Sequence, residues 1–148
     1  MGLWGWALEA YARPGVPEIC LELQDEHGQN ISFLLWAVWA EGAQDDVLIA
    51  AALAAKVWDE DVLKPVRAVR RTLKRTFPKI DDGAREALRD DVKAAELRAE
   101  RVLLESFEAL SGHRRGGRPA LEALVAASRA WGKPAPDDLL ARLAGALS

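Results

Sequence analysis

The segment at residues 31–40 limits the folds open to this chain more than any other feature. It reads ISFLLWAVWA, carries no charged side chain, and places Trp36 and Trp39 three positions apart, on one face of a helix. At ten residues it is well short of the ~20 that cross a bilayer. A helix that is apolar on nearly every side is normally buried on most of them. We therefore expect this helix to lie at the centre of a helical bundle.

The rest of the sequence predicts further helices and no sheet. Ala, Leu, Glu and Arg dominate, all of them good helix formers, and most valines fall at helical rather than alternating spacing. Hydrophobic residues make up 50% of the chain and charged residues 29%, which is ordinary for a globular protein. We predict an all-α fold, a single-domain irregular or orthogonal bundle of seven to eight helices spanning residues 1–148.

Proline, glycine and capping residues divide the chain into elements. We expect helices over residues 3–12, 17–27, 31–40, 45–58, 62–76, 81–110, 119–131 and 137–147. Pro65 leaves two alternatives, because a proline inside a continuous helix costs ~3 kcal/mol or more. The first is a break near Asp59, and the second is one kinked helix. We expect residues 1–111 to form the main bundle, 113–118 to form a mobile loop, and the helices of 119–148 to attach loosely.

Tryptophan is concentrated at the start of the chain. Five of the six tryptophans occur within the first 58 residues, at Trp4, Trp6, Trp36, Trp39 and Trp58. One interpretation is a pocket for an apolar ligand, since tryptophan is common at binding sites. The other is a tryptophan-rich core around the helix at 31–40, and this second interpretation is favoured.

Charge is strongly segregated although the net charge is only −3. Residues 1–63 carry 11 acidic and two basic side chains, whereas residues 64–79 carry seven basic side chains and no acidic one. Six of the seven fall within about 140° of a helical wheel: Lys64, Arg67, Arg70, Arg71, Lys74 and Arg75. This basic amphipathic helix (64–79) predicts a surface for an acidic protein or an anionic ligand. A solvated face and internal pairing with acidic residues are the alternatives.

The same charge pattern bears on partners. Opposite charges on different parts of the chain allow self-association, so a homodimer is open. Nucleic acid is disfavoured as a partner, because nucleic-acid-binding domains are usually basic and this chain has a pI of about 5.5.

Motifs of catalysis and metal binding are absent from the sequence. There are two histidines and one cysteine, no Glu-x-x-His pair, and no G-x-S-x-G, P-loop or dinucleotide fingerprint. Cys20 is expected to be a small buried hydrophobic residue. We therefore expect no enzymatic activity, no cofactor and no metal. A single cysteine and an N-terminus unlike a signal peptide predict a soluble, cytoplasmic protein without a transmembrane segment.

Several short motifs together carry a family resemblance. They are Leu3-Trp4, Trp6-Ala7, Pro14-Gly15-Val16, Cys20-Leu21 and Leu34-Leu35-Trp36, continued by Trp58, Pro65, Arg67 and Arg70-Arg71. On these residues the chain resembles a family of small, uncharacterised proteobacterial helical proteins classed as a domain of unknown function. The resemblance covers roughly the first three quarters of the chain. It implies a bacterial, cytoplasmic helical protein and assigns no activity, partner or site residue.

Two functions follow from these patterns. The first is a non-enzymatic interaction or adaptor protein that binds an anionic partner through the basic helix at 64–79. The alternative is a small-ligand-binding protein with a Trp-lined pocket for an acyl or aromatic group. An enzyme that uses the basic residues to hold an anionic substrate is disfavoured.

Overall fold

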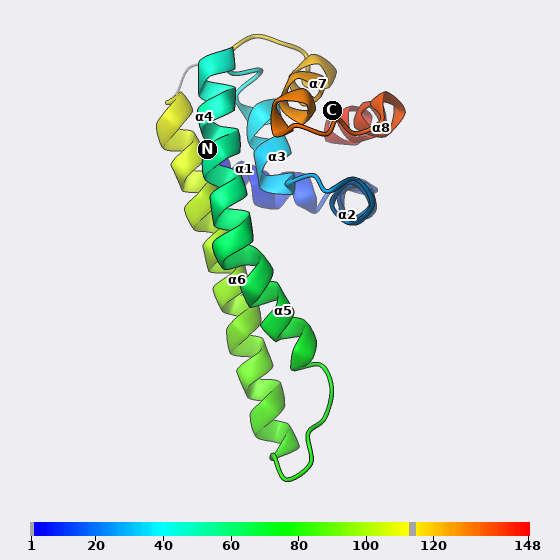
Figure 1. Cartoon of the computed structure of the whole chain (residues 1–148). Helices are drawn as coiled ribbons and strands as arrows, with labels where there is room; N and C mark the ends of the chain where they lie inside the picture. The colour runs from blue at the N-terminus through cyan, green and yellow to red at the C-terminus, as the bar shows by residue number, and fades with distance from the viewer. Residues whose placement is uncertain (1, 113–114) are drawn as a thin grey trace.

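The computed structural model describes residues 2–112 and 115–148, and within them every regular element is helical (Figure 1). The elements are α1 (Leu3–Tyr11), α2 (Val16–His27), α3 (Ile31–Trp39), α4 (Asp45–Trp58), a π-helical segment (Asp59–Leu63), α5 (Lys64–Thr72), α6 (Asp82–Ser111), α7 (Ala120–Trp131) and α8 (Asp137–Leu147). The predicted all-α class is confirmed. None of these helices is both long and apolar enough to span a membrane.

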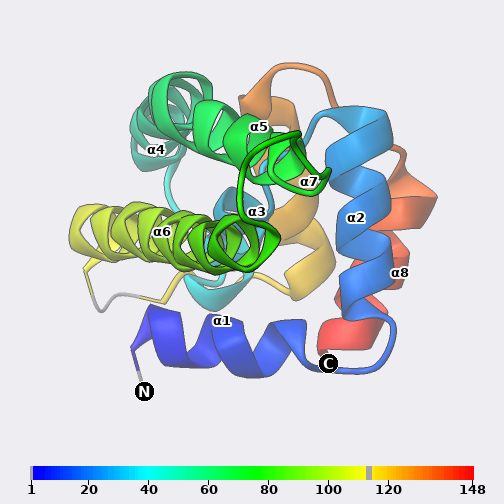
Figure 2. The same cartoon turned by 90° about the horizontal axis from the view of Figure 1, so that it is seen from below.

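Helix α3 lies in the middle of the molecule, as its sequence predicts (Figure 2). Its Phe33 and Trp36 are fully buried, together with Phe107 of α6. The ring centres of Phe33 and Trp36 lie 5.9 and 5.2 Å from that of Phe107, so the three rings form one aromatic cluster. Helices α1, α2 and α7 pack against α3, and α8 packs against α2 and α7. We call these five helices the head.

The two C-terminal helices belong to the same core, so their expected loose attachment is wrong. Leu124 of α7 and Leu140 and Leu143 of α8 are fully buried in the cluster that contains the α3 side chains. Their amphipathic sequences bury these apolar positions against α3 and α2, and the linker between them is also anchored. Buried Ser128 accepts a hydrogen bond from the backbone N–H of Ala135 at 2.8 Å.

Helices α4 and α5 form one continuous helix through the π-helical segment, so the expected break near Asp59 is wrong. The backbone N–H of Lys64 donates to the carbonyl of Asp59, five residues earlier. In an α-helix the ring of Pro65 would clash with the carbonyl one turn earlier, and the wider π-helical turn relieves this clash. The second alternative, a single helix, is the one the structure adopts.

The α4–α5 helix and α6 run antiparallel and project well beyond the head (Figure 1). We call the projecting part, made of α5, the loop at 73–81 and the first half of α6, the arm. Helix α5 ends at Thr72 rather than near residue 76, because Arg85 of α6 holds the chain there by donating to the carbonyl of Leu73. Asp81 caps α6 by accepting a hydrogen bond from the N–H of Ala84 at 2.8 Å.

The connection from α6 to α7 was expected to be a mobile loop, and residues 113 and 114 lie outside the described part. Residues 115–118 are held against the end of α3. The N–H groups of Gly116 and Arg118 donate to the carbonyls of Ala40 and Glu41 at 2.8 and 2.9 Å. The guanidinium of Arg115 stacks over the ring of Trp39, 4.0 Å from its centre. For these four residues the expectation is wrong, because backbone hydrogen bonds and stacking hold them in place.

Candidate functional site

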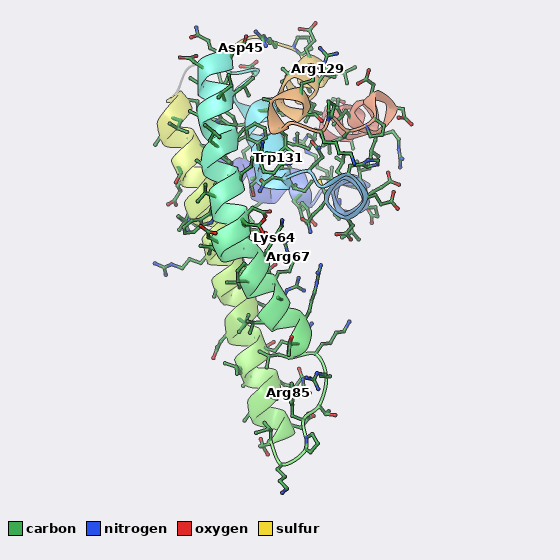
Figure 3. The ribbon with its side chains drawn as sticks, in the orientation of Figure 1. Asp45, Lys64, Arg67, Arg85, Arg129 and Trp131 are labelled. Carbon is green, nitrogen blue, oxygen red and sulfur yellow. The ribbon has the colours of Figure 1, made fainter. Side chains whose placement is uncertain are left out.

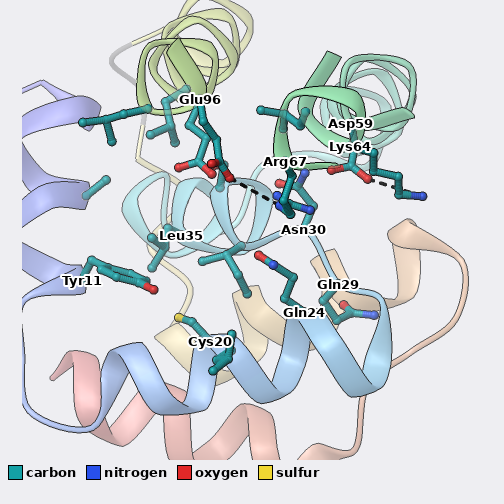
Figure 4. A pocket seen from close by; sticks show the side chains of 18 of the residues that line it. Tyr11, Cys20, Gln24, Gln29, Asn30, Leu35, Asp59, Lys64, Arg67 and Glu96 are labelled. Atoms are coloured by element: carbon teal, nitrogen blue, oxygen red, sulfur yellow. Dashed lines mark ion pairs between the residues drawn. The ribbon is translucent and has the colours of Figure 1, made fainter. Parts of the chain in front are cut away.

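A cleft of about 1050 Å³, open to solvent, separates the head from the α4–α5 helix and α6 (Figure 4). Helices α1, α2 and α3 form one wall, and the π-helical segment, α5 and α6 form the other. Small-molecule sites in proteins usually occupy roughly 300–1000 Å³, so this cleft is at the upper end of that range. It is large enough for an organic ligand.

Much of the lining is apolar and comes from both walls. Because α1 and α2 cover α3 with only one face each, some of their leucine and tyrosine side chains turn to the cleft and stay half exposed. The apolar lining includes Ala7, Leu8, Tyr11, Cys20, Leu21, Leu35, Leu63, Leu97 and Leu104. Such a surface favours the apolar part of a ligand over water.

Three polar side chains of the head converge on this apolar lining. Figure 4 shows Tyr11 and Gln24 reaching into the cavity, and Asn30 also lines it. Burial raises the pKa of Tyr11, and nearby acidic groups add to that effect, so its hydroxyl stays protonated and can donate a hydrogen bond. Asn30 already caps α3, accepting from the N–H of Phe33 at 2.9 Å. Tyr11 and Gln24 therefore remain to orient a ligand.

The opposite wall carries a cluster of three charged side chains. Arg67 and Arg70 lie three residues apart on α5 and share one face of that helix. Their Nε atoms lie 3.5 and 2.6 Å from the carboxylate of Glu96 on α6. Only 14%, 27% and 14% of the three side chains, in the order Arg67, Arg70, Glu96, is exposed. We call this group the arginine corner.

Two further carboxyl groups lie beside the arginine corner. Burial raises the pKa of Glu100, the negative charge of Glu96 raises it further, and Arg67 and Arg70 partly oppose the change. Burial also raises the pKa of Asp59 against the opposing effects of Arg67 and Lys64. Both shifts favour the neutral acid. Each of these two carboxyl groups therefore keeps its proton to a higher pH than an exposed carboxyl group does.

Cys20 lines the cleft but is buried, and no described residue is an ionic partner that would activate it. Burial raises the pKa of its thiol to about 12, so the sulfur stays protonated at neutral pH. A protonated thiol is a weak nucleophile and a poor metal ligand. Within residues 2–112 and 115–148, no group of three or more His, Cys, Asp or Glu side chains could hold a metal ion.

The five tryptophans predicted as pocket residues lie in different environments. Trp36 and Trp39 are buried in the core, and the indole N–H of Trp36 donates to Ser111 Oγ at 3.1 Å. Trp6 packs at the edge of the core, and Trp58 donates to the carbonyl of Ala99 at 2.9 Å. Trp4 lines the cleft.

A tryptophan from outside that predicted group, Trp131 of α7, also lines the cleft. Its indole N–H donates to the carbonyl of Gly28 at 2.8 Å, and Lys56 lies over its ring, 5.4 Å from the centre. Its position 73 residues after Trp58 gave no sign that it would lie beside the other cleft residues.

The six basic residues predicted as a partner surface divide into two groups. Lys64, Arg67 and Arg70 line the cleft, and Figure 3 shows Lys64 and Arg67 on the side of the helix that faces the head. Arg71, Lys74 and Arg75 are exposed on the arm. The alternative of internal pairing thus holds for the first group. Lys64 pairs with Asp59 and Glu60 at 3.9 and 2.7 Å, within the acidic first 63 residues. Arg67 and Arg70 pair instead with Glu96 of α6.

The fold and the cleft together define an all-helical protein with a solvent-open site between a helical head and an antiparallel helix pair. Residues 2–107 match the family described as Protein of unknown function (DUF2390), and the chain belongs to that family. The matched region contains every cleft residue except Trp131, so the family's own sequence builds the site. No curated protein and no solved structure gives a significant match.

Proposed function

We propose that this protein binds a small, largely apolar molecule in the cleft between the head and the α4–α5 and α6 helices. The observation that carries the proposal is the coincidence of size and chemistry: about 1050 Å³, walls rich in leucine, and a few convergent polar groups. An acyl chain or an aromatic ring system fits this lining. The site uses Trp4 and Trp131 rather than the buried Trp36 and Trp39.

The proposal includes that the protein binds its ligand without catalysing a reaction on it. It is supported by the protonated state of the Cys20 thiol, whose pKa is raised to about 12, because that state lacks nucleophilic character. A cytoplasmic location is part of it as well, supported by a single cysteine that is buried and unpaired.

A neutral fluorescent probe tests the proposal. N-phenyl-1-naphthylamine is apolar and uncharged, and its emission rises when it leaves water. We expect a saturable rise with about one probe per chain. Leu8 lines the cleft and is 48% exposed, so Leu8→Ser should leave the fold intact and weaken binding by roughly fivefold or more, from lost apolar contact.

A leucine outside the cleft provides the matched control. Leu53 of α4 is 61% exposed and does not line the cleft, so Leu53→Ser should leave probe affinity unchanged. Absence of saturable probe binding would refute the proposed function, and so would equal losses in the two variants. Native mass spectrometry of the purified protein adds a direct search for a retained apolar molecule.

A second candidate function uses the basic residues that stay exposed. Arg71 and Lys74 have no ion pair with any described residue, and Arg75 stacks on Phe77, 4.2 Å from its ring centre, near the tip of the arm. We propose that this surface contacts an acidic protein. Arg71→Glu with Lys74→Glu should abolish retention on immobilised poly-glutamate at low salt, with an unchanged helical circular dichroism signal. Unchanged retention would exclude this surface.

A further inference from the structure

We propose that the cleft takes a ligand with an anionic head, a carboxylate or a phosphate, and that this head binds Arg67 and Arg70 in competition with Glu96. The inference rests on the proposed function and adds to it the charge and the position of the ligand's head. The apolar part of the ligand then lies against the wall of the cleft that α1, α2 and α3 form. Figure 4 shows the residues concerned, with Arg67 and Glu96 on one side of the cleft and Tyr11, Cys20 and Leu35 on the other.

The first support is the charge balance of the arginine corner. Two guanidinium groups share the single carboxylate of Glu96, which leaves one positive charge in excess. All three side chains are largely shielded from water, so that charge is poorly compensated by solvent. An anion entering from the cleft would compensate it.

The second support is the set of hydrogen-bond donors left over. Each arginine carries five N–H donors in a planar fork, and its contact to Glu96 is made through Nε. No hydrogen bond or ion pair within the described residues uses a terminal amino group of Arg67 or Arg70. The Nε of Arg70 is itself buried and, although 2.6 Å from Glu96, lies outside the hydrogen-bond direction. Such forks match carboxylate and phosphate oxygens.

Four other acidic side chains line the cleft, and within the described residues none of them forms an ion pair with Arg67 or Arg70: Asp59, Glu60, Asp61 and Glu100. Glu60 is paired with Lys64 at 2.7 Å, and Asp59 lies 3.9 Å from the same ammonium group. Burial and the charge of Glu96 raise the pKa of Glu100 and so favour its neutral form. A cationic ligand head would meet the excess arginine charge, which disfavours it.

Head-group specificity can be measured with four probes that share a twelve-carbon chain. Dodecanoate, dodecyl phosphate, neutral dodecanol and dodecyltrimethylammonium are each used below micelle formation to displace N-phenyl-1-naphthylamine from the protein. We expect the two anions to displace the dye at concentrations about tenfold lower than the alcohol, the gain expected from one charge-assisted hydrogen bond. The order of the two anions shows whether the site prefers a carboxylate or a phosphate.

Three variants test whether the arginine corner is responsible. Arg67→Gln and Arg70→Gln should each remove most of the anion preference and leave dodecanol affinity within about twofold. Arg71→Gln, one position further on the same helix and exposed, is the control and should behave as the wild type.

Glu96→Gln gives a change of opposite sign, which damage to the fold cannot imitate. Removing the competing carboxylate should tighten dodecanoate binding by about fivefold. Glu105→Gln is the matched control, since Glu105 lies on the same helix in an ion pair with Arg101 at 2.8 Å and does not line the cleft. It should leave binding unchanged.

The outcomes separate this inference from the function on which it rests. Absence of saturable dye binding would refute both. Dye binding with equal displacement by all four probes, or with the ammonium probe strongest, would overturn only the anionic head. Loss of dodecanoate affinity in Glu96→Gln would also overturn it, because the carboxylate would then be part of the site rather than a competitor.

Discussion

Ser128→Ala should destabilise the protein far more than its small size suggests, because Ser128 joins the α2–α3 connection to the two C-terminal helices. Its side chain is fully buried on α7 and serves two partners. The hydroxyl donates to Gln29 Oε1 at 3.0 Å and accepts from the N–H of Ala135 at 2.8 Å. Gln29 in turn donates to the carbonyl of Lys133 at 2.8 Å. One hydroxyl thus joins the α2–α3 connection to the α7–α8 linker.

The magnitude follows from the partners that the substitution leaves behind. A buried polar group without a hydrogen bond costs about 1–3 kcal/mol, and Ser128→Ala orphans two, the Ala135 N–H and Gln29 Oε1. Alanine returns about 0.5 kcal/mol through its higher helix propensity. We expect the free energy of unfolding to fall by about 2–4 kcal/mol, and the melting temperature by roughly 5–15 °C for a chain of this length.

Urea and thermal unfolding measure this loss, with Ser106→Ala as the control. Ser106 also lies within a helix, but it is exposed and bonds only the carbonyl of Val102, one turn back. Its replacement carries the same propensity gain and leaves no buried partner, so stability should stay within about 0.5 kcal/mol of the wild type. Equal stability of the two variants would refute the reasoning. In Gln29→Ala/Ser128→Ala the combined loss should be less than additive, because Oε1 is then absent.

Three further outcomes are expected. The pKa of Glu100 is raised first by burial and then by the charges of Glu96 and Asp59, while Arg67 and Arg70 oppose the change. Above the ordinary pKa of 4.5 the unfolded chain therefore releases a proton that the folded protein still holds. The free energy of unfolding falls as the pH rises from that value through the folded pKa. Glu100→Gln should therefore be more stable than wild type in urea unfolding at pH 7.5, with a gap that closes towards pH 4, and a pH-independent gap would contradict this. Gly116→Ala should cost about 1–3 kcal/mol in thermal unfolding, since its methyl group would collide with the carbonyls of Glu41 and Gly42, whereas Gly145→Ala, in open space on α8, should be neutral or stabilising. The Cys20 thiol, with a pKa of about 12, should resist Ellman's reagent at pH 8 until urea unfolds the chain, and rapid reaction of the folded protein would show that it is accessible.

Local signals in the sequence were sufficient to predict the fold class and the central helix. The uncharged, almost wholly apolar segment at residues 31–40 predicts a buried helix. Asn30 begins that helix and Gly28 ends the one before it, as capping rules predict. The break expected near Asp59 was wrong because proline rules assume an α-helical turn. The turn before Pro65 is π-helical instead. The loose C-terminus was wrong because the contact between Ser128 and Gln29 spans 99 residues, which no local pattern reveals.

The candidate site was harder to predict, because it depends on which helices face one another. The favoured interpretation of the tryptophan pattern assigned Trp36 and Trp39 to the core, where the structure buries them. The pocket interpretation grouped them with Trp4, and of these three only Trp4 reaches the cleft. Glu96 and Glu100 are four residues apart in the sequence, a spacing that places both on one face of α6. That spacing identifies one acidic face of α6 but does not show which helix packs against it.

The register of the α5–α6 hairpin supplies the missing information. A helical wheel places Arg67, Arg70 and Arg71 on one basic face, and nothing in α5 alone divides that face. The division comes from α6, which is held against α5 at the tip by the contact of Arg85 with the Leu73 carbonyl and against α4 by Trp58 bonding to Ala99. In that register Glu96 lies opposite the first two arginines and not the third. Because side chains three or four residues apart lie one above another on a helix, a slip of a single turn would present a different pair to Glu96. The arginine corner therefore depends on the register of the α5–α6 hairpin. The two hydrogen bonds that fix this register, from Arg85 and from Trp58, also fix the position of the proposed anion site.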